Sequence, residues 1–333
     1  MSMESGRTSG FVRNTDLESL LSELEDLFKP SEAEALARAT IPGRPVILVI
    51  GAPRSGTTLM LQWLAASGSL AYPTNLLSRF YHAPAMGARI HQLLANPKFA
   101  HRDELDGIAH PIHFDSDLGK TRGPLAPNEF WYFWRRFLPT TDIEPMGERV
   151  SDVDFAGLRK ALAAMTGVFG KAMAMKGMML QYDLETIGEQ IPEAFFLHVE
   201  REPSANARSI LDARRKFFGD PGRWYSAKPP NVELLLDREP EDQAAGQVLF
   251  TNARIRQGLD CLTAERYLRV PYETFCADPQ ETWSQLVDKL SSYGEALPEK
   301  HPFSQPFQAT REARCDDEVK RAVDRMSREL HPH

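Results

Sequence analysis

Long apolar segments are missing from this chain of 333 residues, although 42% of its residues are hydrophobic. No apolar run approaches the roughly 18 residues that cross a bilayer, and the N-terminus lacks the basic-then-apolar pattern of a secretory signal. We therefore expect no membrane span. Cysteine is also scarce, because only Cys261, Cys276 and Cys315 occur, scattered and without metal-ligand spacing. Such cysteines fit a reducing cytoplasm.

The chain also lacks an excess of positive charge. It has 39 Lys and Arg residues against 46 Asp and Glu residues, a formal net charge of −7. A surface of this sign is a poor partner for nucleic acid, and no basic–aromatic stripe is present in the sequence. Long sulfated or uronic-acid glycans are disfavoured as ligands for the same reason, since they would be repelled at long range.

The most informative segment present is Ile47–Met60, which reads ILVIGAPRSGTTLM. Its apolar, mainly β-branched run leads into a glycine turn and then into a helical pattern that starts near Gly56. This order predicts a buried strand, a phosphate-binding loop and a helix N-terminus. Gly51 and Gly56 have the spacing of a Walker loop, but Thr57 stands where nucleotide triphosphatases have Lys.

The donors that this loop does have suit one phosphate-like group better than a triphosphate with magnesium. Arg54 and the hydroxyls of Ser55, Thr57 and Thr58 surround Gly56, while backbone N–H groups and the helix dipole favour an anion. Two alternatives stay open: a plain strand–helix turn, and a phosphotransferase with a degenerate Walker loop. The second needs a magnesium-holding carboxylate at another strand end, and no apolar run ends in an evident Asp.

The sequence PRSGTT after an apolar strand resembles the 5′-phosphosulfate loop of sulfotransferases that use 3′-phosphoadenosine 5′-phosphosulfate (PAPS). With Arg in the loop and Leu-Met after the threonines, it looks most similar to the tyrosylprotein sulfotransferases and a broad group of bacterial relatives. The resemblance covers roughly residues 45–295. It implies a P-loop-NTPase-like α/β fold, PAPS as the sulfonate donor, and a 5′ site made of Arg54, Ser55, Gly56, Thr57 and Thr58.

A second segment, Ala194–Leu211, adds to the resemblance. Its apolar run predicts a buried strand that Arg201 closes, and Ser209 follows eight residues later on a predicted helix. In the family this pair clamps the 3′-phosphate of the donor, which suits the fork of an Arg and the hydroxyl of a Ser. The tyrosylprotein enzymes add an Arg four residues after the Ser. Here Arg214 stands one residue later and is a shifted candidate.

The resemblance assigns two further residues. Lys176 ends a short apolar run 25 residues before Arg201, and in the family the strand-end lysine stabilises charge on the leaving phosphate. Tyr272, in the segment RVPYETFCADP, would contact the adenosine end of the donor, with simple packing beside a strand end as the alternative. Residues 303–311 are expected to return over the cofactor.

The resemblance does not supply the general base. The tyrosylprotein enzymes carry a Glu 21 residues after the loop Arg, where this chain has Asn75, and an amide cannot accept the proton. Two replacements stay open. His113 lies near Asp115 in the segment HPIHFD, where a carboxylate can hold one imidazole tautomer. Glu129 lies among the aromatic residues of EFWYFW, which would desolvate its carboxylate and make it a better base.

Strand and helix patterns alternate along the chain and predict one parallel sheet covered by helices on both faces. Strands are expected at about 47–50, 173–176, 195–199 and 267–270. Helices are expected at about 16–28, 57–66, 77–94, 180–190, 204–216, 242–264 and 280–292, the first packing on its own domain. Residues 96–128 should form a long irregular excursion. The expected organisation is a disordered N-terminus (1–14), a helical extension (15–44), a single sulfotransferase domain (45–315) and a C-terminal helix or tail (316–333).

These residues and the resemblance together imply a cytoplasmic sulfotransferase. It would move the sulfonate of PAPS to a hydroxyl or amine of a small-molecule, carbohydrate or lipid acceptor, without a metal. Lys176 would be catalytic, with Glu129 or His113 as the base. The alternatives are a P-loop kinase of a small metabolite and a non-catalytic relative that binds the donor or its product, 3′,5′-adenosine bisphosphate (PAP).

Overall fold

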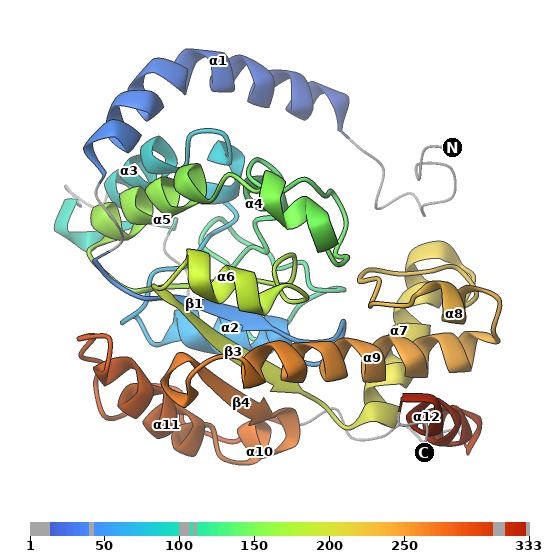
Figure 1. Ribbon diagram of the computed structural model, residues 1–333. Helices are drawn as coiled ribbons and strands as arrows, with labels where there is room; N and C mark the ends of the chain where they lie inside the picture. Colours follow the sequence, from blue (N-terminus) through green and yellow to red (C-terminus); the bar gives the residue numbers. More distant parts are fainter. Residues whose placement is uncertain (1–13, 40–42, 100–106, 109–111, 309–316, 331–333) are drawn as a thin grey trace.

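The computed structural model describes residues 14–39, 43–99, 107–108, 112–308 and 317–330. The expected disorder of residues 1–14 therefore falls, except for Asn14, outside the described residues, as do Cys315 and residues 309–311 of the segment expected over the cofactor. At the centre lies a four-stranded parallel sheet in the order β2-β1-β3-β4 (Figure 1). The strands are β1 (Val46–Ile50), β2 (Met173–Lys176), β3 (Ala194–Glu200) and β4 (Tyr267–Pro271).

The strand β1 is buried on both faces, which explains its uninterrupted apolar sequence. Val46, Leu48 and Ile50 point into one hydrophobic core, whereas Ile47 and Val49 point into the other. All five side chains are buried. The predicted doubly covered parallel sheet in a single domain is thus confirmed.

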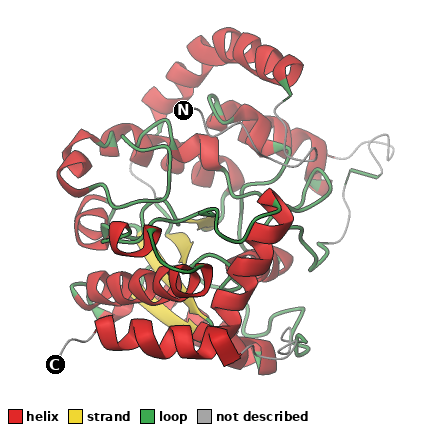
Figure 2. Ribbon diagram, turned by 90° about the vertical axis from the view of Figure 1, so that its right-hand side faces the viewer, coloured by secondary structure: helices red, strands yellow, loops and turns green. Residues whose placement is uncertain are grey.

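Helices cover both faces of this sheet, and Figure 2 shows them above and below the strands. The first core receives side chains from α5, α6 and α9, and the second from α2, α10 and α11. The helices are α1 (Thr15–Arg38), α2 (Thr57–Ala66), α3 (Pro84–Ala95), α4 (Trp131–Trp134), α5 (Phe155–Phe169), α6 (Leu184–Gln190), α7 (Pro203–Phe218), α8 (Glu233–Leu236), α9 (Pro240–Asp260), α10 (Tyr272–Ala277), α11 (Pro279–Ser291) and α12 (Asp317–Leu330).

Four helix predictions were wrong in extent. Of the helices expected over 180–190 and 242–264, α6 starts only at Leu184 and α9 already ends at Asp260. The helix expected over 77–94 is divided into a 3₁₀ turn, Leu77–Phe80, and α3, which starts at Pro84. The division follows from Pro84, whose ring disfavours a helical conformation at Ala83. The first helix was expected to end at residue 28, but α1 continues through Pro30 to Arg38.

The helix α1 packs on its own domain, as expected, with α3 and α5 as neighbours. Glu32 makes the connection: its Oε1 accepts from the Ala85 N–H at 3.1 Å and its Oε2 from the Met86 N–H at 3.0 Å. A carboxylate at this position caps the first turn of α3 and meets the positive end of its dipole. Glu32 is only 4% exposed, so the cap also fixes α1 against the protein.

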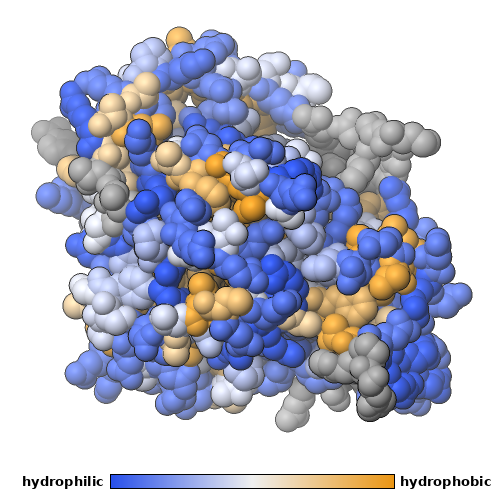
Figure 3. All heavy atoms as spheres, in the orientation of Figure 1, coloured by the Kyte–Doolittle hydropathy of each residue, from blue (hydrophilic) through white to orange (hydrophobic). Residues whose placement is uncertain are grey.

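The face of the protein seen in Figure 3 is mainly hydrophilic, with apolar residues in separate patches. One patch lies over α8, where Leu234 and Leu236 are exposed. Across the ranges that the structure describes, no helix combines the length and the apolar character needed to span a membrane.

Candidate active site

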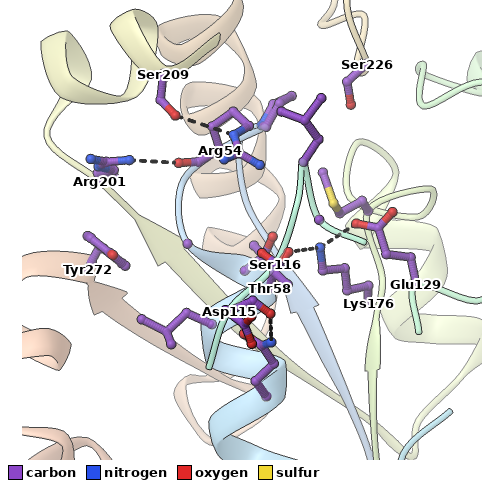
Figure 4. Close-up of a pocket in the computed structure, with 18 of the residues that line it drawn as sticks. Arg54, Thr58, Asp115, Ser116, Glu129, Lys176, Arg201, Ser209, Ser226 and Tyr272 are labelled. Atoms are coloured by element: carbon purple, nitrogen blue, oxygen red, sulfur yellow. Dashed lines mark hydrogen bonds and ion pairs between the residues drawn. The ribbon is translucent and has the colours of Figure 1, made fainter. Parts of the chain in front are cut away.

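A cavity of about 690 Å³ lies where the loop after β1 meets the ends of β2 and β3 (Figure 4). In open α/β sheets, ligands bind at the edge formed by the carboxyl ends of the strands, near the point where the strand order reverses. Here β1 lies between β2 and β3, so the reversal occurs at β1. The volume is within the range of small-molecule sites.

The loop after β1 has the backbone of an anion-binding turn. Gly56 has φ of 102° and directly precedes the first residue of α2, whose first N–H groups have no partner within the helix. A side chain is excluded at Gly56, because a Cβ there would lie 2.3 Å from the Tyr272 ring. Arg54 also has positive φ, 66°. Thr57 and Thr58 line the cavity beside them, as expected.

Four of the residues predicted to bind the donor come together at one end of the cavity (Figure 4). The Arg54 Nε donates to Ser209 Oγ at 3.4 Å, and Arg201 Nη1 donates to the Arg54 carbonyl at 3.3 Å. The Arg201 guanidinium lies over the Tyr272 ring, 5.2 Å from its centroid. Burial raises the pKa of Tyr272 to about 12, so its hydroxyl stays protonated.

At the other end of the cavity, Lys176 and Glu129 form an ion pair, with Lys176 at the last position of β2. The Lys176 Nζ lies 2.5 Å from Glu129 Oε1 and donates to Thr58 Oγ1 at 2.7 Å. The second oxygen of Glu129, Oε2, accepts from the Trp131 indole N–H at 2.5 Å. Only 5% of the Lys176 side chain and 22% of the Glu129 side chain are exposed. The two predicted catalytic residues therefore meet directly beside the anion-binding loop.

His113, the other candidate base, is not brought to this site. Its side chain is exposed and does not line the cavity. Its carbonyl accepts from Gln62 Nε2 at 2.9 Å, which holds the backbone against α2. His110, from the same segment, lies outside the described residues. Asp115 does line the cavity, but without the imidazole that was expected to act with it.

Ser55 also differs from expectation. Its side chain is fully buried and is absent from the cavity lining. The hydroxyl faces Gly51, where a Cβ would lie 2.7 Å from Ser55 Oγ. Its backbone N–H donates to the Ala52 carbonyl at 3.1 Å. The Ser55 hydroxyl therefore faces the inside of the loop, where it has no hydrogen-bond partner within the described structure.

Arg214, the shifted candidate for the 3′-phosphate, is wrong as a ligand-binding residue because it is fully buried away from the cavity. Its guanidinium donates to Gln243 Oε1 at 2.8 Å, to the Pro221 carbonyl at 3.1 Å and to Gln247 Oε1 at 3.3 Å. Burial lowers its pKa to about 10. Gln247 in turn donates to the Tyr225 carbonyl at 2.8 Å. Arg214 thus supports the segment that brings Tyr225 to the cavity wall.

Asn75, which the resemblance to the tyrosylprotein enzymes places at the position of their base, holds the backbone that carries Glu129. Its Nδ2 donates to the Gly123 carbonyl at 2.9 Å, and its Oδ1 accepts from Asn128 Nδ2 at 2.8 Å. Asn128 in turn accepts from the Phe130 N–H at 2.7 Å. The amide therefore fastens both sides of the segment that ends at Glu129.

Several lining residues had no clear signal in the sequence, among them Leu118, Met178, Tyr225 and Ser226. They come from loops with no motif. Of the C-terminal segment, Phe307 and Gln308 line the cavity, in keeping with the expected return toward the site. No group of three or more His, Cys, Asp and Glu side chains is placed to hold a metal within the described parts of the chain.

Sheet order, the loop at the switch point and the lysine at the end of β2 define an anion-binding α/β protein of the P-loop type. A model of the sulfotransferase family matches residues 45–292, which is most of the chain. The chain therefore belongs to the sulfotransferase family and is a sulfotransferase enzyme, which confirms the predicted family.

A solved structure supports the fold. Sulfotransferase STF9 from Mycobacterium avium is 16% identical with a TM-score of 0.55, over 99% of this chain and 80% of that one. Sulfotransferase STF1 from Mycobacterium tuberculosis H37Rv is 15% identical with a TM-score of 0.48, over 92% and 76% of the two chains. At these identities the first likeness supports the fold alone. No curated protein matches the sequence.

Proposed function

We propose that this sulfotransferase uses PAPS as its donor and transfers the sulfonate to a hydroxyl or amine of a small-molecule, carbohydrate or lipid acceptor. The observation that carries the proposal is the position of Lys176 between Thr58 of the anion-binding loop and Glu129. A cation, an anion-binding helix N-terminus and a carboxylate then surround the same point of one cavity.

The residues present fit the donor. The first turn of α2, Thr57, Thr58 and Arg54 offer backbone, hydroxyl and guanidinium donors for a 5′-phosphosulfate. Arg201 and Ser209 lie on the other side of Arg54 and would hold a 3′-phosphate. When bound, PAPS supplies an activated sulfonate.

Two residues of this chain, Lys176 and Glu129, then act on the bound donor and acceptor. Lys176 holds a positive charge beside the loop, where negative charge develops on the leaving phosphate. Glu129, held by Lys176 and Trp131, accepts the proton of the acceptor hydroxyl. The acceptor oxygen bonds to sulfur, while the bridging sulfur–oxygen bond breaks and its electron pair stays on the 5′-phosphate. We also propose a reducing cytoplasm as the site of action, since the two described cysteines, Cys261 and Cys276, are free.

Thermal unfolding with PAP, ATP or AMP, each with magnesium and with EDTA, tests the donor. A ligand at about 100 times its Kd adds roughly 2.7 kcal/mol of stability, which is a shift of several degrees. We expect PAP to stabilise the protein equally in magnesium and in EDTA. Stabilisation by ATP that requires magnesium would instead overturn PAPS as the donor. Binding of PAP without sulfonate transfer to any hydroxyl or amine tested would overturn the proposed acceptor class.

A further inference from the structure

The backbone of the anion-binding loop, residues 51–56, is held from two sides by buried amide side chains. The strands β2 and β3 flank β1 in the sheet. Gln181 follows β2 along the chain, and Asn206 lies in α7, which follows β3. Both side chains are 0% exposed. Each amide reaches the loop from the strand on its own side of β1.

Gln181 provides a hydrogen bond at the point where the sheet ends. The pairing of β1 with β2 ends at Val49 and Lys176. Alternate residues of a strand direct their N–H groups to the same neighbour, so the next N–H of the chain on this side belongs to Gly51. It donates to Gln181 Oε1 at 3.1 Å. The side chain thus supplies the acceptor that β2 no longer provides, and it fixes the start of the loop.

Asn206 holds the loop two residues further on. Its Nδ2 donates to the Pro53 carbonyl at 2.6 Å. Its Oδ1 is buried and has no hydrogen-bond partner within the described structure, and burying an amide oxygen in this way costs stability. Packing alone therefore does not account for an amide at this position, whereas its hydrogen bond to the loop does.

These bonds decide which backbone groups the loop can offer to a ligand. The carbonyls of Ala52, Pro53 and Arg54 each accept a hydrogen bond from a donor of the protein. The first N–H groups of α2, in contrast, have no partner within the helix. A loop that keeps its carbonyl oxygens paired and leaves N–H groups to the ligand suits an anion.

We infer that Gln181 and Asn206 are positioning residues, which hold the loop in the conformation that binds the 5′-phosphosulfate of the donor. This inference rests on the proposed function. Neither residue lines the cavity, so each acts only through the backbone that it holds, at Gly51 or at Pro53. Arg201 also bonds to this backbone, but it lines the cavity and is proposed to bind the 3′-phosphate.

Two ligands that differ only in the 5′-phosphate test the inference: PAP and adenosine 3′-monophosphate (3′-AMP). Asn206→Leu keeps a side chain of similar size and removes the donor to Pro53. We expect the Kd of PAP to rise by about tenfold or more, which is the worth of one hydrogen bond to a charged group. The Kd of 3′-AMP should stay unchanged. Calorimetry measures PAP directly and 3′-AMP by its displacement of PAP.

Asn252→Leu is the matched control. Asn252 is likewise a buried amide on a helix, α9, and its Oδ1 lies 3.4 Å from His198 Nε2. It does not line the cavity. The same substitution there should leave the Kd of both ligands unchanged, because it removes a buried amide that holds no part of the loop.

Gln181→Met tests the other side of the loop. Methionine has a similar length, but its sulfur is only a weak acceptor for the Gly51 N–H. We expect the same selective loss of PAP affinity as in Asn206→Leu. Thermal unfolding without ligand shows which variants are folded, and Gln181→Met decides the matter if Asn206→Leu does not fold.

The outcomes separate the two proposals. A folded wild-type protein that does not bind PAP overturns the proposed function and this inference with it. If the wild type binds PAP, an unchanged PAP Kd in the folded variants overturns the inference alone. Equal weakening of PAP and 3′-AMP, or the same change in Asn252→Leu, would also overturn it, since either result shows a general effect on the fold.

Discussion

At the residue scale, Glu129 has the contacts that the proposed base needs. It is fixed by Lys176 on one oxygen and by Trp131 on the other, so its position is set before an acceptor arrives. A base that is held in place contributes more than one that must be ordered on binding. Asn75 contributes by fastening the segment that carries Glu129.

Replacing Glu129 with Gln should lower kcat by about 10² to 10⁴, the usual contribution of a positioned base. Gln keeps the shape and a carbonyl for the bond from Lys176, but it cannot take a proton. Measurement of kcat at saturating PAPS and of the PAP Kd by calorimetry checks this, with the Kd expected to stay unchanged. His113→Asn is the matched control and should leave both quantities as they are, because His113 is exposed and does not line the cavity. Wild-type turnover in Glu129→Gln, or a loss confined to His113→Asn, would reverse the assignment.

At the scale of elements, a buried arginine connects three parts of the structure. Arg214 on α7 donates to two glutamines of α9 and to the loop at Pro221. It also lies over the Trp224 ring, 5.1 Å from the centroid. Hydrogen bonds from a charged group are stronger than neutral ones. The network holds the segment that places Tyr225 and Ser226 in the wall of the cavity.

Replacing Arg214 with Met should reduce the free energy of unfolding by about 2 to 4 kcal/mol, because three acceptors, two on α9 and one in the loop at Pro221, lose their donor. It should also raise the KM for the acceptor while the PAP Kd changes little. Urea unfolding and steady-state kinetics measure both effects. Arg215→Met is the control on the same helix: its ion pair with Asp212 is exposed and should be worth less than about 1 kcal/mol. Equal stability of the two variants would contradict a structural role for Arg214.

At the scale of the whole molecule, two histidines whose ring nitrogens are buried, His91 and His198, make stability depend on pH. Burial lowers the pKa of His91 and of His198 from 6.5 to about 4. Above pH 6.5 both histidines are neutral in the folded and unfolded states, and their contribution to the free energy of unfolding is fully present. As the pH falls from 6.5 toward 4, the two histidines bind protons in the unfolded chain but stay neutral in the folded protein. The free energy of unfolding therefore decreases. Each histidine accounts for up to about 3 kcal/mol of this loss.

His91→Phe should remove about half of that loss. Within the described structure neither ring nitrogen of His91 has a hydrogen-bond partner, and the ring packs edge-on against Phe169 with centroids 5.3 Å apart. Urea unfolding at pH 7.5, 6 and 5 for the wild type and the variant gives the difference in slope. The exposed His113→Asn variant serves as reference and should follow the wild type. A His91→Phe variant with the wild-type pH dependence would show that His91 titrates normally.

The sequence by itself determined the sheet, the loop and most of the residues at the Arg201 end of the cavity. A buried parallel strand must be apolar on both faces, so 47–50, 173–176 and 195–199 were readable as strands, and the residue that ends or follows each strand was readable as a site candidate. Lys176 and Arg201 were found in this way. These inferences hold because strand ends and helix starts are local properties of the chain.

Only the tertiary structure decided which side chains meet at the Lys176 end of the cavity. The pairing of Glu129 with Lys176 and the burial of Arg214 depend on contacts between segments far apart in sequence. Leu118, Met178 and Tyr225 come from three separate loops and meet only in the folded cavity. A loop carries no periodic pattern that indicates where its side chains point, since its path is set by what it packs against.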